Sequence, residues 1–140
     1  MPEVSVRLVS PGGGSFKWVL DYGGEAHDYF VHLTAPEGAS WEAQGADLFS
    51  SLQDIRRQIE PRGWRICVNG ARLDAYPSRL SLDTSGGHWI YIVRRWWPAR
   101  RVYIFDAAPV GKIASVAEQD EYFEKWSKWV KRGRGFDPAP

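Results

Sequence analysis

Cysteine and net charge are nearly absent from this sequence. The chain of 140 residues has a single cysteine, Cys67, which excludes an internal disulfide and a cysteine-based metal cluster. Its 18 lysines and arginines almost balance its 17 aspartates and glutamates, so no overall charge draws the protein toward nucleic acid or anionic lipid. We therefore expect a cytoplasmic protein that meets any charged partner through a local patch.

Long apolar runs are absent as well. No uninterrupted apolar stretch reaches the roughly 18 residues that a membrane span needs. Glu3 and Arg7 interrupt the first residues, where a secretion signal would be apolar. We expect no membrane partner.

What the sequence does have is the pattern of a small α+β domain. Hydrophobic residues make up 44% of the chain, which is enough for one domain with its own core. Alternating apolar positions predict strands, with a tight turn at Gly23-Gly24 between the second and third. The predicted strands cover residues 4–8, 16–22, 29–33, 64–69, 88–93 and 101–106.

Two helices are predicted from apolar residues three and four positions apart. The first runs through Leu48 and Ile59, and the second follows Ser115, which with Glu118 has capping-box spacing. The order is then βββ-α-βββ-α, a two-layer sandwich with a mainly antiparallel sheet of five to six strands and both helices on one face. Residues 1–132 form the predicted domain, and residues 133–140 a loosely held tail.

No motif for catalysis or metal binding stands out. Cys67 lies in an apolar strand, where a small buried side chain is expected, and the three histidines lack the spacing of metal ligands. We predict no catalytic residue, no metal and no cofactor. A small enzyme with a site in the 69–83 loop stays open, provided that Asp74, Ser78 and Asp106 converge in one cleft.

Two segments are candidates for binding a partner. The first is the polar loop "NGARLDAYPSRL", because long loops on a rigid scaffold often carry recognition. Its candidate contacts are Arg72, Asp74, Tyr76 and Arg79. An equally weighted alternative is that Arg72 and Asp74 only fix the conformation of the loop.

The second segment is "VRRWWPARRVY", residues 93–103, whose candidate contacts are Arg94, Trp96, Trp97 and Arg100. Tryptophan and arginine are the preferred residues of protein-binding hot spots. The same residues suit single-stranded nucleic acid, with phosphates on arginine and bases on tryptophan. A structural alternative is the end of a hairpin, where arginines shield a sheet edge and aromatic residues pair across strands.

From Asn69 onward the motifs occur in a familiar order. The stretches "NGARLDAYPS", "ARRVYIFD" and "SVAEQDEYFEKW" are similar to N-G-A-x-x-x-x-Y-P-S, D-I-F-D and T-V-E-E-Q-x-x-F-Y-x-x-W, which mark a family of small, mostly uncharacterised bacterial proteins. The resemblance covers roughly residues 46–130. It departs at "SRLSLDTSGG", where Arg79 stands in place of a glycine.

The resemblance implies a fold and a loop but no reaction. By analogy with small bacterial proteins that lack a catalytic signature, we predict a non-enzymatic protein-binding module of the immunity or accessory type, which binds and blocks a toxin or effector. The alternatives are the nucleic-acid binder at Arg94–Arg101 and the small enzyme at the 69–83 loop.

Overall fold

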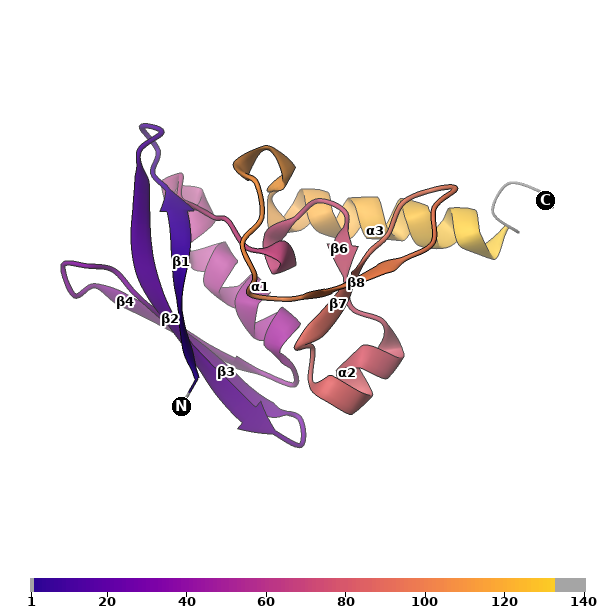
Figure 1. Cartoon of the computed structure of the whole chain (residues 1–140), viewed down its shortest axis with the longest axis horizontal. Helices are drawn as coiled ribbons and strands as arrows, with labels where there is room; N and C mark the ends of the chain where they lie inside the picture. Colours follow the sequence, from indigo (N-terminus) through magenta and orange to yellow (C-terminus); the bar gives the residue numbers. More distant parts are fainter. Residues whose placement is uncertain (1, 133–140) are drawn as a thin grey trace.

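A computed structural model describes residues 2–132 and shows an α+β protein, as predicted, with two antiparallel sheets and three α-helices within that range (Figure 1). The larger sheet lies at one end of the molecule and the smaller sheet at the other, with helix α1 between them. The predicted single sheet of five to six strands is therefore wrong. The larger sheet has five strands and the smaller three.

The larger sheet has the strand order β4-β3-β2-β1-β5. Its strands alternate as the sequence predicts: Val6 and Leu8 are buried and Arg7 is exposed between them. All neighbours pair antiparallel, and Val6 lies opposite Trp18. The strands are β1 (Glu3–Val9), β2 (Ser15–Glu25), β3 (Asp28–Thr34), β4 (Ser40–Gly45) and β5 (Arg65–Ile66).

The turn between β2 and β3 lies further along the chain than predicted. Glu25 pairs with Asp28, so Ala26 and His27 form the two-residue loop, with φ of 50° and 69°. Gly24 lies within β2 opposite Tyr29, where a Cβ would come within 2.3 Å of the Asp28 carbonyl oxygen. Gly24 therefore allows β2 and β3 to approach each other closely, and it is not part of the turn.

Helix α1 (Leu48–Ile59) covers the inner face of the larger sheet. It begins where predicted, because the Asp47 side chain accepts a hydrogen bond from the Ser50 amide at 2.7 Å and caps the helix. Leu48, Leu52 and Ile59 are fully buried along the predicted stripe. This packing forms the main core of the protein.

The smaller sheet, in the order β6-β7-β8, and the helix beside it come from a region where the sequence predicted only a polar loop and two strands. The loop contains the two-residue strand β6 and a seven-residue helix, α2, both too short to give a periodic pattern. The elements are β6 (Ala75–Tyr76), α2 (Arg79–Ser85), β7 (Trp89–Ile92) and β8 (Arg100–Tyr103), with 3-10 turns at Glu60–Arg62, Asn69–Ala71 and Val110–Lys112.

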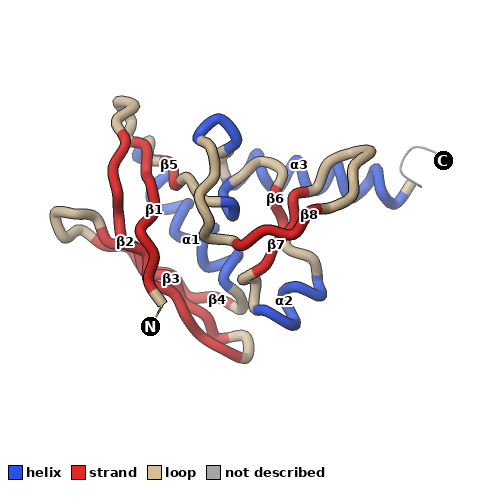
Figure 2. Tube along the Cα trace, viewed as in Figure 1, coloured by secondary structure: helices blue, strands red, loops and turns tan. Residues whose placement is uncertain are grey.

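Helix α3 (Val116–Lys131) begins with the predicted capping box, in which Ser115 and Glu118 each accept the other's backbone N–H. It lies beside α1 and β6 and continues along the connection between β7 and β8 (Figure 2). The prediction of two helices on one face of one sheet is wrong, because α3 packs at the smaller sheet. No described helix has the length and apolar character that crossing a membrane requires. The predicted tail, residues 133–140, lies outside the described residues.

Candidate functional site

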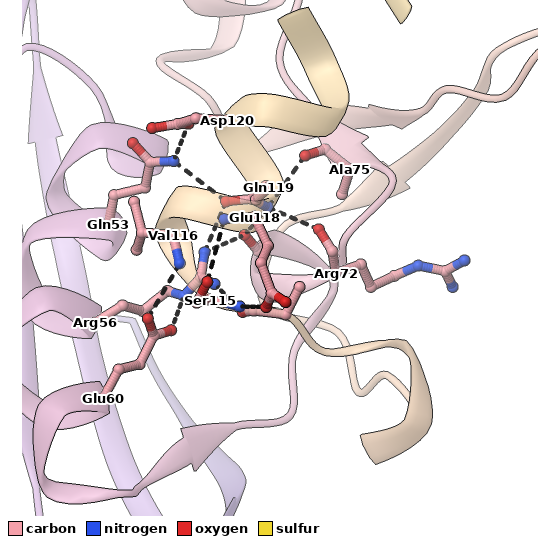
Figure 3. Close-up of polar contacts among 12 residues, drawn as sticks. Gln53, Arg56, Glu60, Arg72, Ala75, Ser115, Val116, Glu118, Gln119 and Asp120 are labelled. Atoms are coloured by element: carbon pink, nitrogen blue, oxygen red, sulfur yellow. Dashed lines mark hydrogen bonds and ion pairs between the residues drawn. The ribbon is translucent and has the colours of Figure 1, made fainter. Parts of the chain in front are cut away.

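A buried cluster of polar side chains joins the two halves of the molecule (Figure 3). At its centre is Gln119 of α3, which is fully buried. Its Nε2 atom lies 2.9 Å from the carbonyl oxygen of Gly70, 2.8 Å from that of Arg72 and 3.1 Å from that of Ala75. One amide therefore fixes the loop between β5 and β6 onto α3.

The other side of the Gln119 amide binds α1. Its Oε1 accepts hydrogen bonds from Arg56 Nη1 at 2.7 Å and from Gln53 Nε2 at 3.2 Å. Arg56 is also fully buried and pairs with Glu60 at 2.7 Å, and its Nη2 donates to the Ala114 carbonyl. We call Gln53, Arg56 and Gln119 the glutamine cluster. Burial lowers the pKa of Arg56, with the Glu60 carboxylate opposing that shift.

The glutamine cluster explains the position of the first candidate segment. Arg72 and Asp74 are 7% and 8% exposed, and they pair through Nε–Oδ1 at 2.9 Å and Nη2–Oδ2 at 3.2 Å. Gly70 lies so close to Leu52 and Ile104 that a Cβ would come within 2.5 Å of a Leu52 methyl carbon. The loop from Asn69 to Tyr76 is thus packed, and Arg72 and Asp74 fix its conformation.

Tyr76 is half-buried against α3. Its ring stacks on Phe123 with centroids 3.9 Å apart, and its hydroxyl donates to Asp120 Oδ1 at 3.0 Å. Burial, together with the Asp120 carboxylate, raises the pKa of Tyr76 to about 12. The hydroxyl of Tyr76 is therefore already hydrogen-bonded within the protein.

The three residues of the enzyme hypothesis lie apart. Ser78 caps α2, where its Oγ accepts from the Ser81 amide at 3.0 Å. Asp74 is paired with Arg72 and lines a different hollow from Ser78, and Asp106 lines neither. Within residues 2–132, no three side chains of the metal-binding types are grouped as ligands. Asp74, Ser78 and Asp106 therefore do not converge in one cleft, which is the arrangement that the enzyme hypothesis requires.

The second candidate segment, residues 93–103, comprises the connection between β7 and β8, residues 93–99, and strand β8 itself. The Tyr122 hydroxyl donates to the Val93 carbonyl at 3.0 Å, the Arg95 guanidinium lies 5.6 Å from the Trp129 ring, and the Trp96 ring meets Trp129 edge-on at 5.1 Å. These contacts hold the connection against α3. Trp96 and Trp97 nevertheless remain 72% and 70% exposed.

Trp96 also has an unfavourable backbone conformation. Its φ is 72°, in the left-handed region that favours glycine or asparagine. A bulky side chain there costs roughly 1–2 kcal/mol. The backbone strain at Trp96 therefore lowers the free energy of unfolding, although most of the side chain stays exposed to solvent.

An apolar groove runs beside this connection, between α2 and α3. Its volume is about 440 Å³, and Leu80 at its edge is 68% exposed. Apart from the tyrosines, Ser78 is the only residue lining the groove that carries a hydroxyl group. The indole Nε1 of Trp126 is buried there without an acceptor among the described residues. The groove is lined by Tyr76, Pro77, Ser78, Leu80, Tyr91, Val93, Ala99, Phe123 and Trp126.

Two further hollows adjoin the groove, and Trp97 lines both. One, of about 660 Å³, lies toward Arg100 and Arg101, and the other, of about 410 Å³, toward Arg95 and Lys125. Ala99 and Trp126 each line the groove as well as one of these hollows. We call Arg94, Arg95, Trp96, Trp97, Arg100 and Arg101 the Arg–Trp surface.

Of the predicted contacts, Arg94, Trp97 and Arg100 line one hollow together, whereas Trp96 is exposed and contacts Trp129 instead. Arg79 is exposed at the start of α2, next to Leu80 of the groove. Sequence reasoning missed the glutamine cluster, although both Arg56 and Gln119 occupy apolar-stripe positions of their helices. A polar residue at a helix position that faces the core is a sequence signal for such a buried cluster.

No protein-family model matches this chain, and no curated protein matches it. The resemblance carried by the N-G-A-x-x-x-x-Y-P-S loop and the C-terminal helix stays a prediction.

Proposed function

We propose that this protein is a non-enzymatic binding module whose Arg–Trp surface and adjoining groove contact another protein. The observation that carries the proposal is the exposure of Trp96 and Trp97, at 72% and 70%, on a connection held against α3. Binding hot spots are enriched in tryptophan and arginine, and a preformed groove lowers the entropic cost of binding a partner.

The energetics support a partner. Tryptophan side chains are among the largest contributors of buried area in interfaces, and truncating one at a hot spot typically costs about 2 kcal/mol or more of binding free energy. The left-handed backbone of Trp96 costs stability in the free protein. A tryptophan at a strained position whose ring is mostly exposed fits a role in binding better than a role in folding.

We further propose that the partner is a toxin or effector that the protein blocks, as an immunity or accessory protein of a bacterium would. The support is analogy by type: a small α+β domain with an apolar groove beside exposed tryptophans. A cytoplasmic site of action belongs to this proposal, since the lone Cys67 is buried as a thiol.

Site-specific photo-crosslinking in the native host tests the proposal. A benzophenone amino acid in place of Trp97 should yield one specific protein adduct, because the residue lies between two hollows of the surface. The matched control is the same substitution at Phe16, an aromatic residue of the larger sheet that is 46% exposed. Equal labelling at both positions, or no protein adduct at position 97, contradicts the proposal.

Nucleic acid is the second candidate, because Arg100 and Arg101 form no ion pair within residues 2–132 and lie beside exposed Trp97. Titration with oligothymidylate at low and moderate salt tests it through tryptophan fluorescence. Salt-sensitive quenching that is lost in the Trp97→Ala variant would favour nucleic acid over protein.

A further inference from the structure

Charge is segregated on this molecule to a degree that the net charge hides. The whole chain carries a formal charge of +1. Yet Arg94, Arg95, Arg100, Arg101 and Lys125 line the two hollows around Trp97, and no aspartate or glutamate lines either hollow or the apolar groove. The Arg–Trp surface is therefore locally cationic, which favours an acidic partner.

The nearest carboxylate does not neutralise this surface. Asp74 lies 3.7 Å from Arg94 Nε, but it already pairs with the buried Arg72 at 2.9 Å. The single negative charge of Asp74 is thus shared by two arginines, which leaves one positive charge uncompensated. That charge lies at the surface, because the Arg94 side chain is 48% exposed. Lys125 is matched by Glu121 at 3.3 Å, so the arginines alone supply the uncompensated charge.

The apolar groove adds a second requirement. Its walls include Leu80, Phe123 and Trp126, which would desolvate a phosphate without pairing it but would accept an aliphatic or aromatic side chain. Because the groove shares Ala99 with the arginine-lined hollow, an anchor seated in it lies next to Arg100.

We propose that the partner presents an acidic segment with one large apolar anchor, which enters the groove between α2 and α3 while neighbouring carboxylates meet Arg94 and Arg100. This proposal rests on the protein-binding function proposed above and specifies its partner chemistry. Trp97 separates the two hollows, and the groove shares Ala99 with one of them and Trp126 with the other. An extended stretch of the partner chain therefore fits the three depressions better than an isolated residue does.

Selection from a displayed library of random peptides of about twelve residues, long enough for extended recognition, tests this chemistry without knowledge of the natural partner. The full chain is the bait, and the Trp96→Ala/Trp97→Ala variant is used for counter-selection. The enriched peptides should carry net negative charge next to a leucine, isoleucine, phenylalanine or tryptophan.

Charge reversal then locates the contacts. Arg94→Glu/Arg100→Glu should weaken binding of the selected peptides about tenfold or more at low salt, and raising the salt should narrow that difference. The matched control is Arg7→Glu, an exposed arginine on the larger sheet, which should leave the affinity unchanged. Melting curves of both variants confirm that each is folded.

The outcomes separate the two proposals. Neutral or basic peptides that depend on Trp97, or acidic peptides that bind equally to the reversed variant, overturn the acidic-anchor inference and leave the protein-binding function standing. Failure to enrich any peptide over the counter-selected variant, together with salt-sensitive binding of oligothymidylate, overturns both.

Discussion

Two sets of arginine and aromatic residues lie within about thirty positions of each other along the sequence, and the structure gives them opposite surroundings. In the buried set, Arg72, Asp74 and Tyr76 make the ion pair and hydrogen bond that hold the loop against α3. In the exposed set, Trp96 and Trp97 leave most of their rings in water, and Arg94 shares its carboxylate with Arg72. Residue type made both segments candidate contact surfaces. Burial makes the first, with the glutamine cluster, a structural support and leaves the second, the Arg–Trp surface, as the exposed face.

The support is completed by side chains that satisfy one another. Gln119 uses both its amide nitrogen and its oxygen, and Arg56 and Gln53 engage that oxygen. Each buried polar group therefore depends on several others, and loss of one leaves the rest unpaired. Variants in the support should lower stability, whereas variants in the face should lower binding.

The largest effect is expected at Gln119. Replacement by alanine removes the hydrogen bonds that Gln119 makes with Arg56 Nη1 and with three backbone carbonyls, so we expect a loss of about 3–5 kcal/mol in the free energy of unfolding. Denaturant unfolding measures it, with Gln58→Ala on the exposed side of α1 as the control, expected within about 0.5 kcal/mol of the parent. A Gln119→Ala protein as stable as its control would show that the glutamine cluster does not hold the two halves together.

Asp74→Ala should have the next largest effect. The variant leaves the buried guanidinium of Arg72 without its carboxylate, which costs about 2–4 kcal/mol. Arg94→Ala removes the exposed arginine of the same trio and should cost less than about 1 kcal/mol. Equal losses in the two variants would contradict the division between support and face.

Tyr76 makes the support sensitive to alkaline pH. Its pKa is raised from a usual value near 10 to about 12, so the folded protein holds this proton more tightly than the unfolded chain does. The stabilisation is fully present below the unfolded pKa and is lost as the pH rises from about 10 to about 12. Urea unfolding across this range should show a steeper decline in the parent than in Tyr76→Phe, and parallel declines would contradict the assignment.

Trp96→Gly should have the smallest effect on stability. Glycine relieves the left-handed strain at φ of 72° but loses the edge-on contact with Trp129, so the two changes offset each other to within about 1 kcal/mol. Affinity for the crosslinked partner should nevertheless fall. A large loss of stability would mean that Trp96 belongs to the support.

The sequence predicted best where periodicity is long. The alternation over residues 16–22 predicted most of β2, although not its end at Glu25, and the stripe from Leu48 to Ile59 predicted α1. The capping box at Ser115 marked the start of α3. The sequence did not predict β4, in which Ala43 is the only buried side chain. It also did not predict β6 and α2, because elements of two and seven residues depend on tertiary contacts rather than on a local pattern.

The candidate site was predictable only where it depends on local sequence rather than on tertiary contacts. The run from Arg94 to Arg100 was expected to be a strand connection, and a connection between β7 and β8 is what the structure shows. Burial of Arg72 and Asp74 was not predictable, because it is imposed by Gln119, more than forty positions away in the sequence.

The most direct test of the division is the affinity of the Trp97→Ala variant for the protein crosslinked at that position, measured calorimetrically beside its melting temperature. We expect the affinity to fall about tenfold or more, as for a hot-spot residue, while the melting temperature stays that of the parent. An unchanged affinity, or a loss of affinity that only accompanies unfolding, would contradict the account.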